Sequence, residues 1–318
     1  MIILTHLGES EPPYLKDCIH QLSLFQITPI LILDPYHKNR ALGQLNVKHI
    51  YTDTLTPTQN HRLFSNHYYG NTQFRNNYWK YVKERFFFIE EAMEQLHLEN
   101  CVAMEYDVLV YTEIESLLSK LSKYAQNKLA FVMDTPDRGH PGFLFVQNSH
   151  TLSAFNEFIV DMIKLPLSDM ELLSMFKREN PEKACCLPVI TQQRNLLASR
   201  TSILGNIVEK PDFLSEGFDE LGVLFDSAVV GQWVGGVDPR NMDKDTIGYE
   251  NEEALYSVKE VGFAWKKIGE KWLPFLDGQP LATIHVHSKA LNCFFSDSTD
   301  TPRASYTREV LLKGLEHN

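Results

Sequence analysis

Two segments that lie far apart in the chain carry side chains typical of metal and phosphate sites. An apolar run ends in Glu105 and Asp107, two residues apart, and a late apolar run contains His285 and His287, followed by Lys289. Residues two apart in a β-strand point to the same face, so each pair would present its two side chains together. Carboxylates and imidazoles bind divalent cations, and a lysine beside the cation is suited to a diphosphate. We therefore predict that the two segments meet around one divalent cation and a phosphate-bearing ligand.

Each segment taken alone also has a simpler interpretation. An aspartate at the end of a strand commonly caps the turn that follows it. Paired histidines on one strand face can be packed and hydrogen-bonded without a metal. The metal interpretation leaves open whether His285 and His287 both bind the ion or whether one of them only supports the site. A mixed set of carboxylates and imidazoles favours Mn²⁺ (or Mg²⁺) over Ca²⁺.

The elements that must position these residues alternate between strands and helices in the first half of the chain. Apolar runs predict strands over residues 2–6, 29–33, 47–51, 101–104, 129–133 and 142–146. Apolar stripes with helical spacing predict helices over residues 12–25, 74–96 and 113–124. This alternation predicts an α/β fold with a mixed, mostly parallel central sheet flanked by helices. Ligands of such sheets gather at the carboxyl ends of the strands, where His6, Asp34, Asp107 and Asp134 fall.

The second half of the chain has a looser pattern. Residues 181–190 and 211–222 are rich in loop-forming residues, and a helix is expected over 226–233. Two strands, 262–267 and 272–276, predict a β-hairpin around Gly269. A strand over 282–287 and a helix over 305–315 follow. We predict one domain with a smaller C-terminal lobe that contains the hairpin.

Composition excludes several classes of protein. The 318 residues carry a formal net charge of −11, which argues against a nucleic-acid partner. The five cysteines show no zinc-binding spacing, so reduced thiols in a cytoplasmic protein are expected. The apolar N-terminal residues lack a basic flank and are expected to form a strand, not a signal sequence. No stretch approaches membrane-spanning length.

Three parts of the sequence resemble nucleotide-sugar-dependent glycosyltransferases of the GT-A type. The strand that ends in Glu105-Tyr106-Asp107 is similar to the DxD motif of that family, with Glu105 in place of the first aspartate. The segment 225–233, which leads to Gly235-Gly236-Val237-Asp238-Pro239-Arg240, and the late segment 285–289 supply the other two parts. The resemblance implies a GT-A-like catalytic domain over 1–318. Residues 1–148 would bind the nucleotide, and 149–318 would hold the acceptor side and the strand that completes the metal site.

The resemblance also assigns roles to individual residues. The residues assigned to the metal are Asp107, His285 and His287. Those assigned to the nucleotide sugar are Thr5, His6, Arg85, Glu105, Tyr106 and Lys289. The implied partners are a nucleoside diphosphate sugar as donor and a glycan or other hydroxyl-bearing acceptor.

A carboxylate that activates the acceptor hydroxyl is expected among two aspartates. Asp226 is the first candidate, but it also precedes a helix and is equally well placed to be its N-cap. Asp238, in a glycine-rich loop, is the second candidate. Whether the anomeric centre is inverted or retained stays open. Two other functions stay open as well: a metal-dependent phosphoesterase or nucleotidyltransferase, and a non-catalytic carbohydrate-binding protein with a decayed site.

Overall fold

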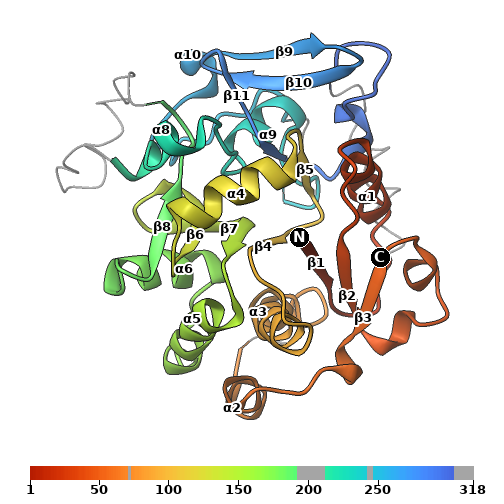
Figure 1. Ribbon diagram of the computed structural model, residues 1–318, viewed down its shortest axis with the longest axis vertical. Coiled ribbons are helices and arrows are strands. Elements are labelled where there is room, and N and C mark those ends of the chain that lie inside the picture. Colours follow the sequence, from red (N-terminus) through yellow and green to blue (C-terminus); the bar gives the residue numbers. More distant parts are fainter. Residues whose placement is uncertain (71–72, 192–211, 242–245, 304–318) are drawn as a thin grey trace.

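A seven-stranded sheet forms the centre of the structure, a computed structural model that describes residues 1–70, 73–191, 212–241 and 246–303 (Figure 1). Its strand order is β3-β2-β1-β4-β7-β6-β8. The strands are β1 (Ile2–His6), β2 (Ile30–Leu33), β3 (Lys48–Tyr51), β4 (Cys101–Met104), β6 (Leu129–Thr135), β7 (Arg138–Val146) and β8 (Ala184–Leu187). Four neighbouring pairs are parallel, and β7 runs antiparallel to both β4 and β6. The predicted mixed, mostly parallel sheet is therefore confirmed.

Continuous apolar runs build this sheet because helices cover both of its faces. All four residues of β2 are buried, as are all four of β4. One face packs against α2 (Gln59–His67), α3 (Tyr78–Gln95), α5 (Ser149–Asp161) and α6 (Asp169–Glu179). The other face packs against α1 (Tyr14–Leu24), α4 (Ile114–Tyr124) and the C-terminal elements (Figure 1).

Two smaller sheets lie on the α1 and α4 side. Strand β5 (Val108–Val110) pairs antiparallel with β12 (Thr283–His285). Strands β9 (Phe263–Ile268), β10 (Lys271–Leu276) and β11 (Gln279–Pro280) form a three-stranded antiparallel sheet, which confirms the predicted hairpin (Figure 1). The remaining helices are α8 (Phe218–Leu221), α9 (Val229–Gly235) and α10 (Val258–Val261). Short 3₁₀ turns cover Pro35–His37, Leu42–Gln44, Thr52–Thr54, Asp212–Leu214 and Leu291–Phe294.

Several predicted boundaries are wrong. The helix expected from residue 74 begins at Tyr78, because the three residues before it adopt left-handed backbone conformations. The helix expected over 226–233 runs from Val229 to Gly235, and the strand expected over 282–287 ends at His285. Residues 181–190, expected as a loop, contain strand β8, whose four apolar side chains are all buried. The helix expected over 305–315 lies outside the described residues.

Helices α5 and α6 were not among the predicted elements. Both have clear N-terminal signals: Asn148 caps α5, and Ser168 and Glu171 form a capping box at the start of α6. Among the described residues, no helix combines the length and the apolarity needed to cross a membrane.

Candidate active site

The pairing of β5 with β12 joins the two segments singled out in the sequence. His285 is the register partner of Val108, and the backbone N–H of Val286 donates to the carbonyl oxygen of Asp107 at 2.8 Å. Glu105, Tyr106 and Asp107 form the bend between β4 and β5. This ladder places the acidic segment against the end of β12, so residues nearly two hundred positions apart share one site.

Three potential metal ligands meet at this point. Glu105, Asp107 and His285 each offer one ligand atom, and these atoms all lie within 4.8 Å of one another. The Nε2 atom of His285 lies 3.1 Å from Oδ2 of Asp107 and 3.6 Å from Oε2 of Glu105. Lys289 forms an ion pair with the same Asp107 oxygen. We call Glu105, Asp107, His285 and Lys289 the cation cluster.

The charges of the cation cluster stabilise one another. Burial by itself would raise the pKa of Asp107, but the neighbouring charges of His285 and Lys289 hold it well below its usual range. Burial would lower the pKa of His285, and attraction to Asp107 outweighs this and raises it. The pKa of Lys289 is raised in the same way, by Asp107 against the effect of burial. Without a bound ion, therefore, the ammonium of Lys289 provides positive charge beside Asp107.

The backbone of Lys289 is held in an unusual conformation. Its φ of 69° lies in the left-handed region, which a residue with a side chain enters at a cost of about 1–2 kcal/mol. The Lys289 N–H donates to the carbonyl oxygen of Val286 at 2.9 Å, closing a turn directly after β12. This turn directs the lysine side chain back toward Asp107.

Asp226 anchors the strand that carries His285. Its Oδ1 accepts from the N–H of Val230 at 2.9 Å, and its Oδ2 accepts from the N–H groups of Gly231 at 2.8 Å and His285 at 2.9 Å. The carboxylate is fully buried, and burial raises its pKa in spite of these hydrogen bonds. Asp226 therefore accepts from N–H groups in the first turn of α9 and ties that helix to β12, whereas the N-cap position expected for Asp226 belongs to Ala228.

Two glycines leave room for His285. A Cβ atom at Gly231 would lie 1.7 Å from the carbonyl oxygen of His285, and a Cβ at Gly142 would lie 3.0 Å from its Nδ1. Gly142 belongs to β7 and Gly231 to α9, so the histidine is enclosed between the sheet and that helix. A side chain at Gly231 would displace the backbone of His285, and one at Gly142 would press on its imidazole.

Arg85 holds Glu105 in place. Its guanidinium donates to Glu105 Oε1 at 2.6 Å and to Asp169 Oδ2 at 2.8 Å. Burial raises the pKa of Asp169, an effect that the charge of Arg85 opposes. Since the two carboxylates engage both terminal nitrogens of the guanidinium, Arg85 acts on the site through Glu105. Asp169 was not among the predicted site residues, although the capping box that begins its helix is a recognisable sequence signal.

His6 and Tyr106 contact each other at the ends of the adjacent parallel strands β1 and β4. His6 Nε2 lies 2.6 Å from the carbonyl oxygen of Ser10, so it carries the proton, and Nδ1 accepts from the hydroxyl of Tyr106 at 3.0 Å. Burial lowers the pKa of His6 to about 4, which keeps its ring neutral at pH 7. The Oγ1 atom of the neighbouring Thr5 is buried and has no hydrogen-bond partner among the described residues.

His287 and Asp238 lie beside the cation cluster in a different arrangement from the one expected. The chain turns after His285, so His287 does not continue the strand face. Nδ1 of His287 accepts from the backbone N–H of Asp238 at 2.8 Å, which leaves its proton on Nε2. Burial and the charge of Lys289 lower the pKa of His287 to about 3. The carboxylate of Asp238 is buried and forms an ion pair with Arg240, with oxygen to nitrogen distances of 2.6–3.1 Å.

The donor set of the cation cluster fits a divalent metal ion. Two carboxylates and one imidazole suit Mn²⁺ or Mg²⁺, and Asp107 carries its negative charge at all ordinary pH values. Tyr14 and Tyr78, which the sequence analysis did not single out, flank this set. The Lys289 ammonium lies 5.9 Å from the ring centre of Tyr14. Tyr78 begins α3, seven positions before Arg85 on the same face of that helix.

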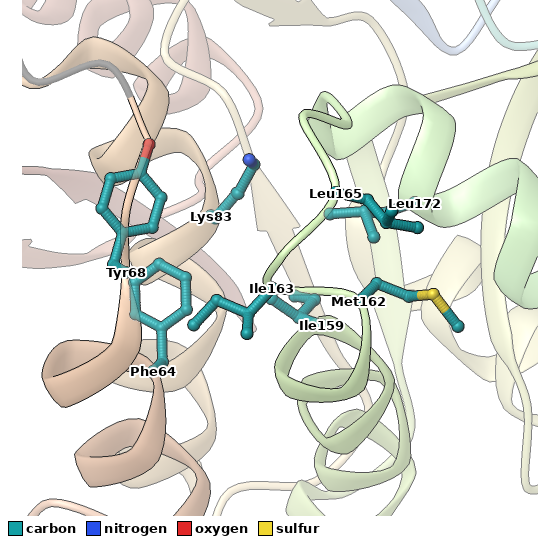
Figure 2. A pocket seen from close by; sticks show the side chains of 8 residues that line it. All are labelled: Phe64, Tyr68, Lys83, Ile159, Met162, Ile163, Leu165 and Leu172. Carbon is teal, nitrogen blue, oxygen red and sulfur yellow. The ribbon is translucent and has the colours of Figure 1, made fainter.

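A small apolar pocket between α2, α3 and α5 is separate from this site. Figure 2 shows its lining, which includes Phe64, Tyr68, Lys83 and Ile159. Its volume of about 10 Å³ has room for about one water molecule. These side chains belong to the helices on the sheet face opposite β5 and β12, so the pocket is a packing gap between helices.

Comparisons with known proteins find similarity in structure but not in sequence. No family model matches the chain, and no curated protein matches it. Among solved structures, mouse xyloside xylosyltransferase 1 in its apo form is similar, with 14% identity over 59% of this chain and 84% of that chain, and a TM-score of 0.38. A glycosyltransferase involved in glycosylation of the major capsid of PBCV-1 shares 11% identity over 58% of this chain and 79% of its own, with a TM-score of 0.35.

A nucleotide-using enzyme is similar to about the same degree. The CMP:2-keto-3-deoxy-manno-octonic acid synthetase, complexed with CTP, shares 11% identity over 59% of this chain and 89% of its own, with a TM-score of 0.32. The similar structures therefore include both glycosyltransferases and a nucleotidyltransferase-type enzyme. The similarity is too distant to carry an argument about activity, which must come from the residues of this chain.

Proposed function

We propose that this protein is a metal-dependent glycosyltransferase that moves a sugar from a nucleoside diphosphate sugar to a hydroxyl-bearing acceptor. One observation carries the proposal: Glu105, Asp107 and His285, from two distant segments, converge within 4.8 Å beside the buried ammonium of Lys289. Such a cluster combines the ligands of a hard divalent cation with a fixed positive charge. A diphosphate is the common ligand that needs both.

The cation, Mn²⁺ or Mg²⁺, would be held by Asp107 and His285, with Glu105 as the third ligand. Such an ion supplies Lewis-acid stabilisation of negative charge on a departing diphosphate. Lys289 would turn from Asp107 toward the phosphates and stabilise the same charge. We assign His287 to a hydrogen bond instead of metal ligation, because its Nδ1 already accepts from Asp238 and its Nε2 carries the proton.

The nucleotide would lie along the ends of β1 and β4. Thr5 has a buried hydroxyl without a partner among the described residues, and a ribose or base can supply one. His6 and Tyr106 form a neutral, hydrogen-bonded pair beside it, which offers ring surfaces without adding charge. Arg85 would support the nucleotide end indirectly, by fixing Glu105.

Asp238 is the preferred candidate to take a proton from the acceptor. Asp226 accepts three backbone hydrogen bonds and serves as an anchor. The ion pair with Arg240 and the hydrogen bond from the Arg240 backbone lower the pKa of Asp238 against the effect of burial, so this carboxylate is ionised at pH 7. In an inverting reaction, Asp238 would have to release Arg240 and accept a hydrogen bond from the acceptor hydroxyl instead.

The test is a thermal-shift screen of nucleoside diphosphates and their sugars, each with and without Mn²⁺. We expect at least one nucleotide to raise the melting temperature only when the metal is present. Asp107→Asn should lose this response. Asp53→Asn, which changes an exposed aspartate paired with Lys38, should keep it. If every nucleotide fails with Mn²⁺ and with Mg²⁺, the proposal is wrong.

Product analysis separates the remaining functions. A glycosylated acceptor identifies a transferase, whereas release of free phosphate or formation of a nucleotide sugar from a triphosphate identifies the phosphoesterase or nucleotidyltransferase. Saccharide binding without any turnover identifies a carbohydrate-binding protein. We also propose a cytoplasmic location, which is supported by five cysteines that are all free thiols.

A further inference from the structure

A group of aromatic side chains lies at the start of α3. The ring centres of Phe74 and Trp79 are 5.7 Å apart with the rings nearly parallel, and Tyr78 lies 5.2 Å from Trp79 and 6.1 Å from Phe74. Phe74 is 39% exposed and Tyr78 is 41% exposed. We call these three residues the aromatic platform. Large rings that remain open to solvent in a contiguous group mark a place where a ligand binds.

The turn that builds the platform is strained. Arg75, Asn76 and Asn77 have φ values of 44°, 49° and 68°, three successive left-handed residues without a glycine. For Arg75 this conformation costs about 1–2 kcal/mol, whereas asparagines enter it more readily. The N–H of Tyr78 donates to the carbonyl oxygen of Phe74 at 3.2 Å and closes the turn. Strain of this kind persists where the surrounding structure holds a segment in one functional arrangement.

The platform adjoins the cation cluster. Tyr78 is the first residue of α3, and Arg85, seven positions later on the same face of that helix, donates to Glu105 of the cation cluster. The guanidinium of Arg75 donates to Oδ1 of Asn241 at 2.9 Å, which ties the turn to the loop that carries Asp238 and Arg240. The aromatic platform is therefore linked to the cation cluster through α3 and to the loop that carries Asp238 through Arg75.

The chemistry of this surface fits a sugar ring. A pyranose has an apolar face of C–H groups, which packs on aromatic rings, and a rim of hydroxyls, which need hydrogen-bond partners. The aromatic platform supplies the rings. The Arg75 guanidinium lies over the Phe74 ring, 5.1 Å from its centre, and Asn76 and Asn77 follow it in the same turn with amide groups. A purely apolar ligand such as a lipid chain would offer no hydrogen-bond partner to the amides of Asn76 and Asn77.

We propose that the aromatic platform of Phe74, Tyr78 and Trp79 binds a pyranose ring of the acceptor, so that the acceptor is a saccharide. This inference rests on the proposed transferase function and narrows its acceptor class. A saccharide stacked on the aromatic platform would lie near the cation cluster, where the acceptor hydroxyl must meet the donor.

The experiment measures saccharide binding to the full chain. Methyl glycosides of common pyranoses are titrated with and without a nucleoside diphosphate and Mn²⁺, and binding is followed by tryptophan fluorescence and saturation-transfer NMR. We expect at least one glycoside to bind saturably. Phe74→Ala should weaken its binding by about tenfold, the scale of a lost aromatic stacking contact. Trp79→Phe should remove the fluorescence change and keep the NMR contact.

The controls separate a local effect from misfolding. Ile268→Ala removes another exposed hydrophobic side chain, 54% exposed at the tip of the β9–β10 hairpin, and should bind the glycoside like the unaltered protein. Tyr78→Leu is the second platform variant. The saccharide affinity of each platform variant is measured at a temperature equally far below its own melting temperature. The inference is wrong if no glycoside binds under either condition, or if Phe74→Ala binds as well as the unaltered chain.

Two further results keep this inference distinct from the proposed function. Loss of nucleotide binding in Phe74→Ala, with saccharide binding unchanged, would assign the platform to the donor and overturn the inference. Saccharide binding that depends on Phe74, in a protein that shows no metal-dependent nucleotide response, would uphold the platform and reject the transferase.

Discussion

The Nε2 atom of His285 lies 3.1 Å from Oδ2 of Asp107 because β12 pairs with β5 in one particular register. If β12 paired with β5 one residue out of register, the side chain of His285 would point to the opposite face of the ladder, away from Asp107. The ladder, the anchor at Asp226 and the two glycines around the imidazole all fix that register. The geometry of the site is thus determined by the packing of β12.

Gly231→Ala should disrupt the site without touching a ligand. The new Cβ would lie 1.7 Å from the backbone carbonyl oxygen of His285, and backbone cannot move aside cheaply. We expect the free energy of unfolding to fall by at least about 2 kcal/mol. The affinity for Mn²⁺ should fall as well. Gly142→Ala, whose Cβ would meet the imidazole at 3.0 Å, should show the same effects more weakly. Urea unfolding measures the free energy of unfolding, and calorimetric titration measures the Mn²⁺ affinity. If Gly231→Ala were as stable as the unaltered protein, the close packing of Gly231 against His285 would be contradicted.

Replacement of Arg85 by methionine should destabilise the protein by about 3 kcal/mol, because it leaves the buried carboxylate of Asp169 without its partner. The double variant Arg85→Met with Asp169→Asn should recover part of this loss, since the uncompensated charge is removed. Mn²⁺ affinity should stay reduced in both, because Glu105 has lost the group that orients it. Denaturant unfolding of the four proteins in the cycle tests this, and strictly additive effects would argue against a shared ion pair.

Lys289→Met should separate metal binding from diphosphate binding. The ammonium now competes with a cation for Asp107, so its removal should leave Mn²⁺ affinity unchanged or increase it. Affinity for a nucleoside diphosphate in the presence of Mn²⁺ should fall by about tenfold or more, since one charge-assisted contact is lost. Titration calorimetry with each ligand measures the two effects. A parallel loss of both affinities would mean that Lys289 is structural.

Stability should depend on pH through His61, which lies far from the cation cluster between α2 and α3. Its Nδ1 lies 2.7 Å from Glu91 and its Nε2 lies 3.5 Å from Glu84. Burial would lower the pKa of His61, but these two carboxylates raise it to about 9 from an ordinary value of 6.5. The contribution to stability is therefore complete below pH 6.5 and disappears as pH rises through about 9.

We expect a loss on the order of 2 kcal/mol in the free energy of unfolding across that interval. His61→Gln should flatten this part of the profile. Urea unfolding at a series of pH values provides the measurement. A profile for His61→Gln that falls as steeply as that of the unaltered protein would show that another group is responsible.

The sequence predicted the central sheet and three residues of the cation cluster for one physical reason. Apolar runs with ligand-type residues at their ends belong to strands whose carboxyl ends face a ligand, which is how Asp107, His285 and Lys289 were found. The direction of His287 could not be predicted, because the chain turns immediately after β12 and local alternation no longer applies. The role of Arg85 was missed because its partner Asp169 lies in a helix that was not identified.

Asp226 shows the other limit of sequence analysis. An aspartate before a helix has the same local pattern whether it caps that helix or faces a substrate, and only tertiary contacts decide. Here the backbone N–H of His285, fifty-nine positions later, is one of its three donors. The platform at Phe74 escaped notice for a similar reason, since the expected helix included the residues that form the strained turn.

The central claim is that the Glu105–Asp107 segment and the end of β12 bind one divalent cation together with a nucleoside diphosphate. Anomalous diffraction from crystals grown with Mn²⁺ and a nucleoside diphosphate tests it most directly. We expect one manganese peak within about 2.0–2.4 Å of Asp107 and His285, with phosphate oxygens completing its coordination. A manganese peak elsewhere, or a nucleotide bound without contact to these two residues, would contradict it.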